Sequence, residues 1–162
     1  MPFTPFHIGP HACVALLFAR RLNVFVFITA NVAVDVEPLL VMMCQLPYPL
    51  HGLAHTFPGA ALVGAALGLM LFPFRGLISR FLRIIRLPAA DGFWHYICAG
   101  VLGGWLHVLF DAVLYAEMNP FFPLNGNPFL GLMGYSTMYL LCALLAIPAL
   151  LIYLVVSGKK QG

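Results

Sequence analysis

The chain has 162 residues, of which 62% are hydrophobic and only 8% are charged, and its formal net charge is +3. Soluble domains carry roughly 25% charged residues, so this composition excludes an ordinary soluble globular domain. It predicts an integral membrane protein made of a single membrane domain, residues 1–162, with almost nothing outside the bilayer.

Long apolar blocks follow one another along the chain. A membrane span needs about 20 helical residues, and four blocks come close to or exceed that length: 23–44, 57–74, 93–116 and 132–156. A shorter fifth block, 6–19, is either a short N-terminal transmembrane helix or a re-entrant one. We therefore expect an all-α bundle of four long transmembrane helices and one short helix. Small residues for close helix contacts stand at Gly59, Gly64, Gly68 and Gly103.

The basic residues cluster on one side of these predicted spans. They lie at 20–21, in the connection 75–92 and at 159–160. The positive-inside rule makes this side cytoplasmic, the C-terminus included. The connection mixes arginines with Leu, Ile and Phe, which predicts an amphipathic helix on the inner leaflet. Its expected contacts with anionic lipid headgroups are Arg75, Arg80, Arg83 and Arg86.

Ionisable residues from four separate segments fall at a similar depth on the opposite, outer side. Within the third long block, a histidine and an aspartate four residues apart share one helix face. The other segments are the outer end of the short block, the outer half of the first long block, and the loop before the second. The eight residues are His7 and His11, Asp35 and Glu37, His51 and His55, and His107 and Asp111.

The three carboxylates in this group need compensation. Unpaired in lipid, Asp35, Glu37 and Asp111 would together cost roughly 8–10 kcal/mol, and that side carries no Lys or Arg. The negative charges can therefore be compensated only by the histidines, by protonation of the carboxylates or by a bound cation. Imidazoles and carboxylates are the ligands preferred by zinc and similar divalent metals, so we expect one or two divalent ions, with zinc first and manganese or iron as alternatives. Taken singly, each pair could equally be a hydrogen-bonded core couple or part of a wet loop.

The order of these elements carries a family resemblance over roughly residues 1–125. "MPFTPFH", an Asp-x-acid pair, "HGLAHT" and "HVLFD" occur in that order. The sequence resembles the predicted membrane-bound metal-dependent hydrolases, including the LexA-regulated inner-membrane hydrolases, a family similar to zinc-dependent phospholipase C. The resemblance implies a prokaryotic inner-membrane location and the ligands His7, Asp35, His55, His107 and Asp111. Val34 stands where that family has proline, and the family's arginine after the first loop histidine has no counterpart here.

These observations predict a metal-dependent hydrolase acting on a lipid or lipid-linked phosphate or ester at the outer leaflet. Glu37 is the candidate general base, and Glu37, His51 and His11 are candidate additional ligands. A proton or ion relay and a non-catalytic metal-binding subunit of a larger complex are the alternatives. Membrane lipids are the expected partners. A nucleic-acid partner is disfavoured, and the sequence leaves open a homo-oligomer or a larger membrane assembly.

Overall fold

The structure, a computed structural model, describes residues 7–158, and these residues form helices and no strands. The predicted all-α fold is therefore confirmed for this part of the chain. Phe6, where the short predicted block begins, and Lys159 and Lys160 lie outside the described residues. The helices are α1 (Ile8–Leu17), α2 (Val24–Val34), α3 (Val36–Met43), η2 (Leu53–His55), α4 (Phe57–Leu71), η3 (Phe72–Phe74), α5 (Arg75–Ile84), α6 (Phe93–Ala112) and α7 (Tyr135–Gly158).

Four helical stretches are long and apolar enough to cross a membrane, as predicted. They are Val24–Met43, Phe57–Ile84, Phe93–Ala112 and Tyr135–Gly158. The third ends four residues before its predicted boundary, and the fourth begins three residues later than predicted. The short helix α1 has 10 residues, which is about 15 Å, or half of a hydrocarbon core.

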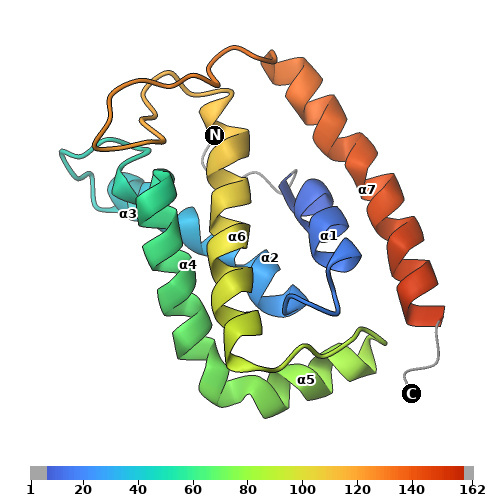
Figure 1. The fold of residues 1–162 in the computed structure, drawn as a ribbon. Coiled ribbons are helices and arrows are strands. Elements are labelled where there is room, and N and C mark those ends of the chain that lie inside the picture. The colour runs from blue at the N-terminus through green and yellow to red at the C-terminus, as the bar shows by residue number, and fades with distance from the viewer. Residues whose placement is uncertain (1–6, 159–162) are drawn as a thin grey trace.

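Helix α6 occupies the middle of the bundle, flanked by α4 and α2, while α7 packs against α1 at the periphery (Figure 1). Glycines permit the close contacts of α6. A Cβ atom at Gly64 would collide with the backbone of Gly100, and one at Gly103 would collide with the carbonyl of Phe27. The predicted role of small residues is thus confirmed for Gly64 and Gly103. Close backbone approach is the usual way in which apolar helices gain packing energy in a membrane.

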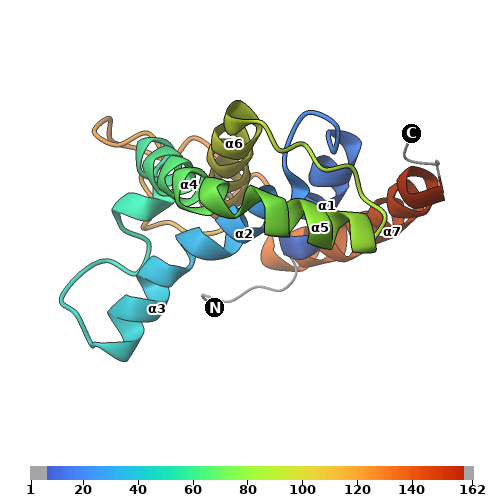
Figure 2. The same cartoon turned by 90° about the horizontal axis from the view of Figure 1, so that it is seen from below.

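The first long stretch is broken at Asp35, where α2 ends and α3 begins. Pro38 accounts for the break, because its ring would clash with the carbonyl of Val34 in a continuous helix. In an ideal helix Asp35 and Glu37 point to opposite sides, so the two can serve one site only if the backbone unwinds near Pro38. The break falls at Asp35, three residues before Pro38, and α3 projects away from the bundle (Figure 2).

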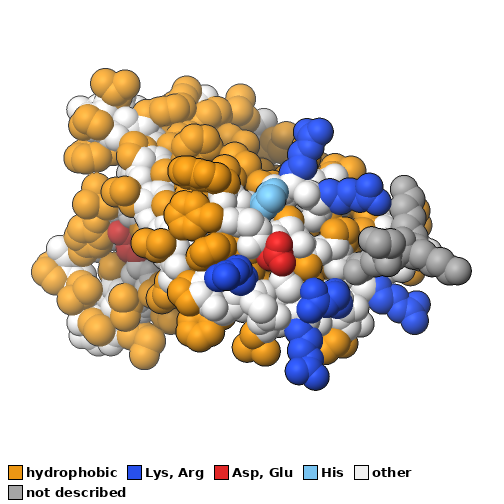
Figure 3. Space-filling view, turned by 60° about the horizontal axis from the view of Figure 1, so that its bottom comes forward, with side chains coloured by type: hydrophobic (Ala, Val, Ile, Leu, Met, Phe, Trp, Pro, Cys, Tyr) orange, Lys and Arg blue, Asp and Glu red, His pale blue; other side chains and the backbone are white. Residues whose placement is uncertain are grey.

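Helix α5 lies across one end of the bundle (Figures 1 and 2) and covers only the first ten residues of the connection 75–92 in which an amphipathic helix was predicted. It buries Ile78 and Leu82 and exposes its arginines. Figure 3 shows basic side chains gathered on this end, with acidic and histidine side chains among them, while hydrophobic side chains are the most frequent kind on the opposite side of that view. We call it the basic end; its described arginines are Arg20, Arg21, Arg75, Arg80, Arg83 and Arg86.

Candidate metal centre

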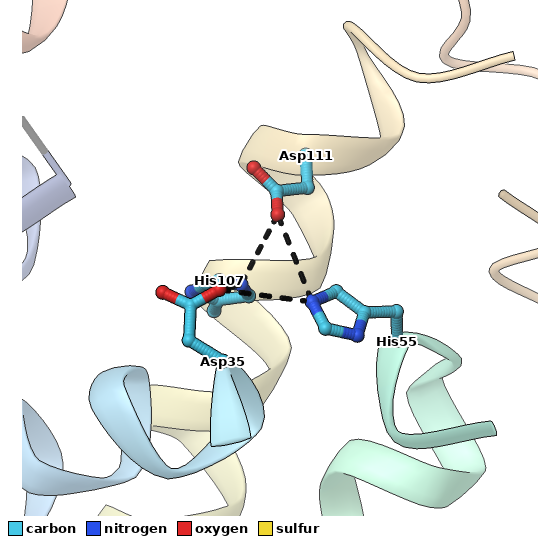
Figure 4. Close-up of side chains that lie close together, drawn as sticks. All are labelled: Asp35, His55, His107 and Asp111. Atoms are coloured by element: carbon cyan, nitrogen blue, oxygen red, sulfur yellow. Dashed lines mark ion pairs between the residues drawn. The ribbon is translucent and has the colours of Figure 1, made fainter. Parts of the chain in front are cut away.

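Four buried side chains meet at the end of the bundle away from the basic end (Figure 4). Asp35 comes from the α2–α3 break, His55 from η2, and His107 and Asp111 from α6. One ligand atom from each of the four lies within 4.8 Å of the others. The group Asp35, His55, His107 and Asp111 could therefore hold a metal ion.

The distances within the group approach those of a tetrahedral site. His107 Nε2 lies 3.1 Å from Asp111 Oδ2 and 3.4 Å from Asp35 Oδ1. His55 Nε2 lies 3.8 Å from Asp111 Oδ2 and 3.9 Å from Asp35 Oδ1. Tetrahedral zinc with bonds of about 2.0–2.1 Å places its ligand atoms about 3.3 Å apart. A small movement of His55 toward the carboxylates would bring its two distances to that spacing.

The Nδ1 atoms of both histidines are already engaged. His107 Nδ1 lies 3.0 Å from Asn31 Oδ1, and His55 Nδ1 lies 2.9 Å from Glu37 Oε2. A carbonyl or carboxylate oxygen can only accept, so each Nδ1–H donates. In a neutral imidazole the remaining Nε2 then carries a lone pair. Outer hydrogen bonds of this kind fix the tautomer of metal-binding histidines.

Both Nε2 atoms are buried and have no hydrogen-bond partner among the described residues. Each lone pair instead faces the oxygens of Asp35 and Asp111, which are also acceptors. Acceptor atoms held this close in a buried site repel each other unless a proton or a cation lies between them. A metal ion bound at their centre would satisfy both nitrogens and both carboxylates at once.

Glu37 lies behind His55 and organises the loop that carries it. Its carboxylate accepts hydrogen bonds from the backbone N–H groups of Gly52 at 3.0 Å and Ala54 at 3.1 Å, in addition to the one from the His55 ring Nδ1–H. Thr56 then caps α4, since its Oγ1 accepts from Gly59 N at 3.0 Å. These contacts fix His55 at the start of α4. They give Glu37 a positioning role, while its predicted role as general base stays a prediction.

The electrostatics of the loop favour a neutral His55. Burial lowers the pKa of His55, and the opposing hydrogen bond to Glu37 does not restore it to the usual value. The ring is therefore neutral at pH 7, which is the form that binds metals.

The two histidines of the N-terminal region differ in their placement. His7 Nε2 lies 3.5 Å from Asp111 Oδ1, the oxygen that faces away from His107. His7 thus contacts Asp111 from outside and is not one of the four residues whose ligand atoms meet. The ring nitrogens of His11 lie 2.7 Å from the carbonyl of His7 and 3.3 Å from that of Gly103. His11 is therefore engaged by backbone oxygens outside the group.

His51 forms a second layer over the group. Its Nδ1 lies 2.8 Å from Glu117 Oε1, and its ring stacks on Tyr115 and meets the His55 ring edge to face. Burial would raise the pKa of Glu117, but hydrogen bonds from its own backbone and from His51 lower it below the usual value. Glu117 is thus the ionised partner of His51, and His51 is held outside the four ligand atoms.

Two residues of the site were missed from the sequence. Asn31 orients His107, and Glu117 pairs with His51. Asn31 stands four residues before Asp35, on the same face of an otherwise apolar helix, and this spacing could have revealed it. Glu117 lies 66 residues from His51 in the chain, and no local pattern joins them.

We compared the chain with protein families, curated proteins and solved structures, and none of them matches it.

Proposed function

We propose that this chain is an integral membrane protein with a divalent metal centre at Asp35, His55, His107 and Asp111, and that it acts as a metal-dependent hydrolase. The observation that carries the proposal is the pair of buried, unpartnered Nε2 atoms facing two carboxylates. The resemblance of the ordered elements to membrane-bound metal-dependent hydrolases supports the reaction class. Zinc is our first candidate, because two imidazoles and two carboxylates suit its ligand preferences.

When bound, such a metal activates water and polarises a phosphoryl or acyl oxygen. The residues of this chain hold the centre in place. Asn31 and Glu37 fix the tautomers of His107 and His55, and His7 lies beside the outward oxygen of Asp111. Helix α6 packs closely on α4 and α2 at its glycines, and this packing holds His107 and Asp111 in place. This rigidity favours catalysis, which needs ligands held in productive geometry before the substrate arrives.

We propose a lipid or lipid-linked phosphate or ester as the substrate class. The centre lies where Asp35, inside the stretch Val24–Met43, meets the start of α4 and the last turns of α6, opposite the basic end. By the positive-inside rule the basic end faces the cytoplasm, which places the centre in the outer half of the bilayer. A site at this depth is reached most easily by molecules that already reside in the membrane.

The first experiment is elemental analysis of the detergent-purified full chain and of its His107→Ala and His95→Ala variants. His95 is a histidine at the basic end and serves as the matched control. We expect about one equivalent of a divalent metal in the wild type and in His95→Ala, with loss in His107→Ala. A metal-loaded protein would then be assayed on lipid phosphates and esters. Absence of bound metal from the wild type purified without chelator would overturn the proposal.

A second candidate function is a metal site that only stabilises the fold. It is favoured by the number of protein ligands, since four fill a tetrahedral zinc site and catalytic sites usually keep one position open. The two candidates differ in one measurement. Hydrolysis that is lost in His107→Ala and retained in His95→Ala supports the enzyme. A fully metal-loaded chain that hydrolyses none of the lipid substrates supports the structural role.

A further inference from the structure

An apolar groove runs along the face of the bundle formed by α1, the start of α2 and α6. Its cavity volume is about 520 Å³, which falls within the roughly 300–1,000 Å³ of small-molecule sites. Its walls include Phe18, Leu22, Phe27 and Leu106, and Arg21 is the one charged residue that lines it. The groove therefore offers apolar contact along its length and a single positive charge.

The position of Arg21 gives the groove a direction. Arg21 lies in the turn between α1 and α2, at the basic end, and its side chain is exposed. The groove is also lined by Phe57, the first residue of α4, and by Leu109, which lies between His107 and Asp111 along α6. The groove thus leads from the basic end toward the depth of the metal centre.

Arg21 has no acidic partner in the described part of the chain. The ion pairs found there all involve histidine, and none uses an arginine. Within residues 7–158, the six arginines of the basic end therefore have no carboxylate within ion-pair distance. An occupant that matches the groove must be apolar along the walls and anionic at Arg21.

We propose that the groove binds an anionic phospholipid of the leaflet at the basic end. One acyl chain lies along the apolar walls, and the phosphate contacts the Arg21 guanidinium, whose planar donors suit phosphate oxygens. The proposal rests on the membrane location included in the proposed function and is independent of the metal and of hydrolysis. The lipid is a bound ligand distinct from the substrate, because the groove residues Trp105 and Leu109 lie about 200° around α6 from His107.

The chain provides its own reporter of this site. Trp94 and Trp105 are its two tryptophans, and Trp105 lines the groove with 41% of its surface exposed. In the Trp94→Phe variant, Trp105 fluorescence alone reports on the groove. The full chain would be placed in phosphatidylcholine vesicles containing brominated phosphatidylglycerol or, in parallel, brominated phosphatidylcholine at the same mole fraction. We expect the apparent affinity for the anionic quencher to be about fivefold higher, which corresponds to one arginine at a membrane surface.

Two neighbouring arginines separate a specific contact from general charge attraction. In the Trp94→Phe background, Arg21→Gln should remove the preference for the anionic quencher. Arg20→Gln is the matched control, since Arg20 does not line the groove, and it should keep the preference. Equal quenching by both lipids, equal losses in the two variants, or no quenching by either lipid would overturn the proposal. Metal content measured on the same samples reports separately on the proposed function.

Discussion

Replacing Asn31 with leucine tests whether the outer hydrogen bond to His107 builds the metal centre. Asn31 is 3% exposed, and its Oδ1 accepts from His107 Nδ1 at 3.0 Å. Leucine keeps a similar volume and removes the acceptor. His107 then loses the contact that holds its Nε2 lone pair toward Asp35 and Asp111, and a buried N–H is left without a partner.

The expected magnitude follows from other outer-shell contacts of metal-binding histidines. Their loss weakens metal affinity by about 10–100-fold, which corresponds to roughly 1.4–2.7 kcal/mol of binding free energy. The assay is a competition titration of zinc between the detergent-purified chain and a coloured chelator. Asn31→Asp retains an acceptor at the same position and should bind zinc more tightly than Asn31→Leu.

The control for this experiment is Thr29→Val on the same helix. Thr29 donates to the carbonyl of Phe25 at 2.7 Å, and this hydrogen bond involves no residue of the metal centre. Its loss should leave zinc affinity unchanged. If Asn31→Leu also binds zinc as tightly as the wild type, while His107→Ala loses it, the position of Nε2 does not depend on Asn31, and the reasoning from tautomers is refuted.

Three further perturbations address the same centre and the packing beneath it. Glu37→Gln leaves an amide oxygen for one of the donors but removes the charge that binds His55 Nδ1, so a titration should show zinc affinity about 10-fold weaker. Gly64→Ala should destabilise the chain by about 1–3 kcal/mol in a thermal melt, because the added Cβ would meet the backbone of Gly100. Gly76 has open space around it, so the control Gly76→Ala should be neutral or slightly stabilising. Equal effects of the two substitutions would contradict the packing argument. Zinc at about 100 times its Kd should add about 2.7 kcal/mol of stability that excess chelator removes, and a melting temperature indifferent to both would contradict a bound ion.

Local patterns in the sequence were sufficient to predict the main elements. The apolar blocks predicted the four long helical stretches, since length and composition alone decide whether a helix can cross a bilayer. The spacing of His107 and Asp111 predicted one helix face, and both reach the same group of ligand atoms. Both predictions depend on the geometry of a single helix, which the chain fixes locally.

Other features depend on contacts between distant segments and were beyond local reasoning. Asp35 and Glu37 lie on either side of the junction between α2 and α3, and the partner of each comes from a distant segment. Asp35 joins the ligand atoms, while Glu37 binds the loop before α4. The pairing of His51 with Glu117 joins two loops through the packing of α4 on α6. Periodicity carries no information on such a contact.

The charges of the centre also indicate which kind of ion it would hold. In a metal-bound centre Asp35 and Asp111 contribute two negative charges, and His55 and His107 contribute none, because histidine binds a metal as the neutral imidazole. A divalent cation makes this group neutral, whereas a monovalent or trivalent ion leaves one net charge. An uncompensated charge costs up to about 2.5–3.5 kcal/mol within a bilayer, the largest cost being at its centre, and the described arginines lie at the other end of the bundle. The four residues thus favour a divalent ion by their charge as well as by their geometry.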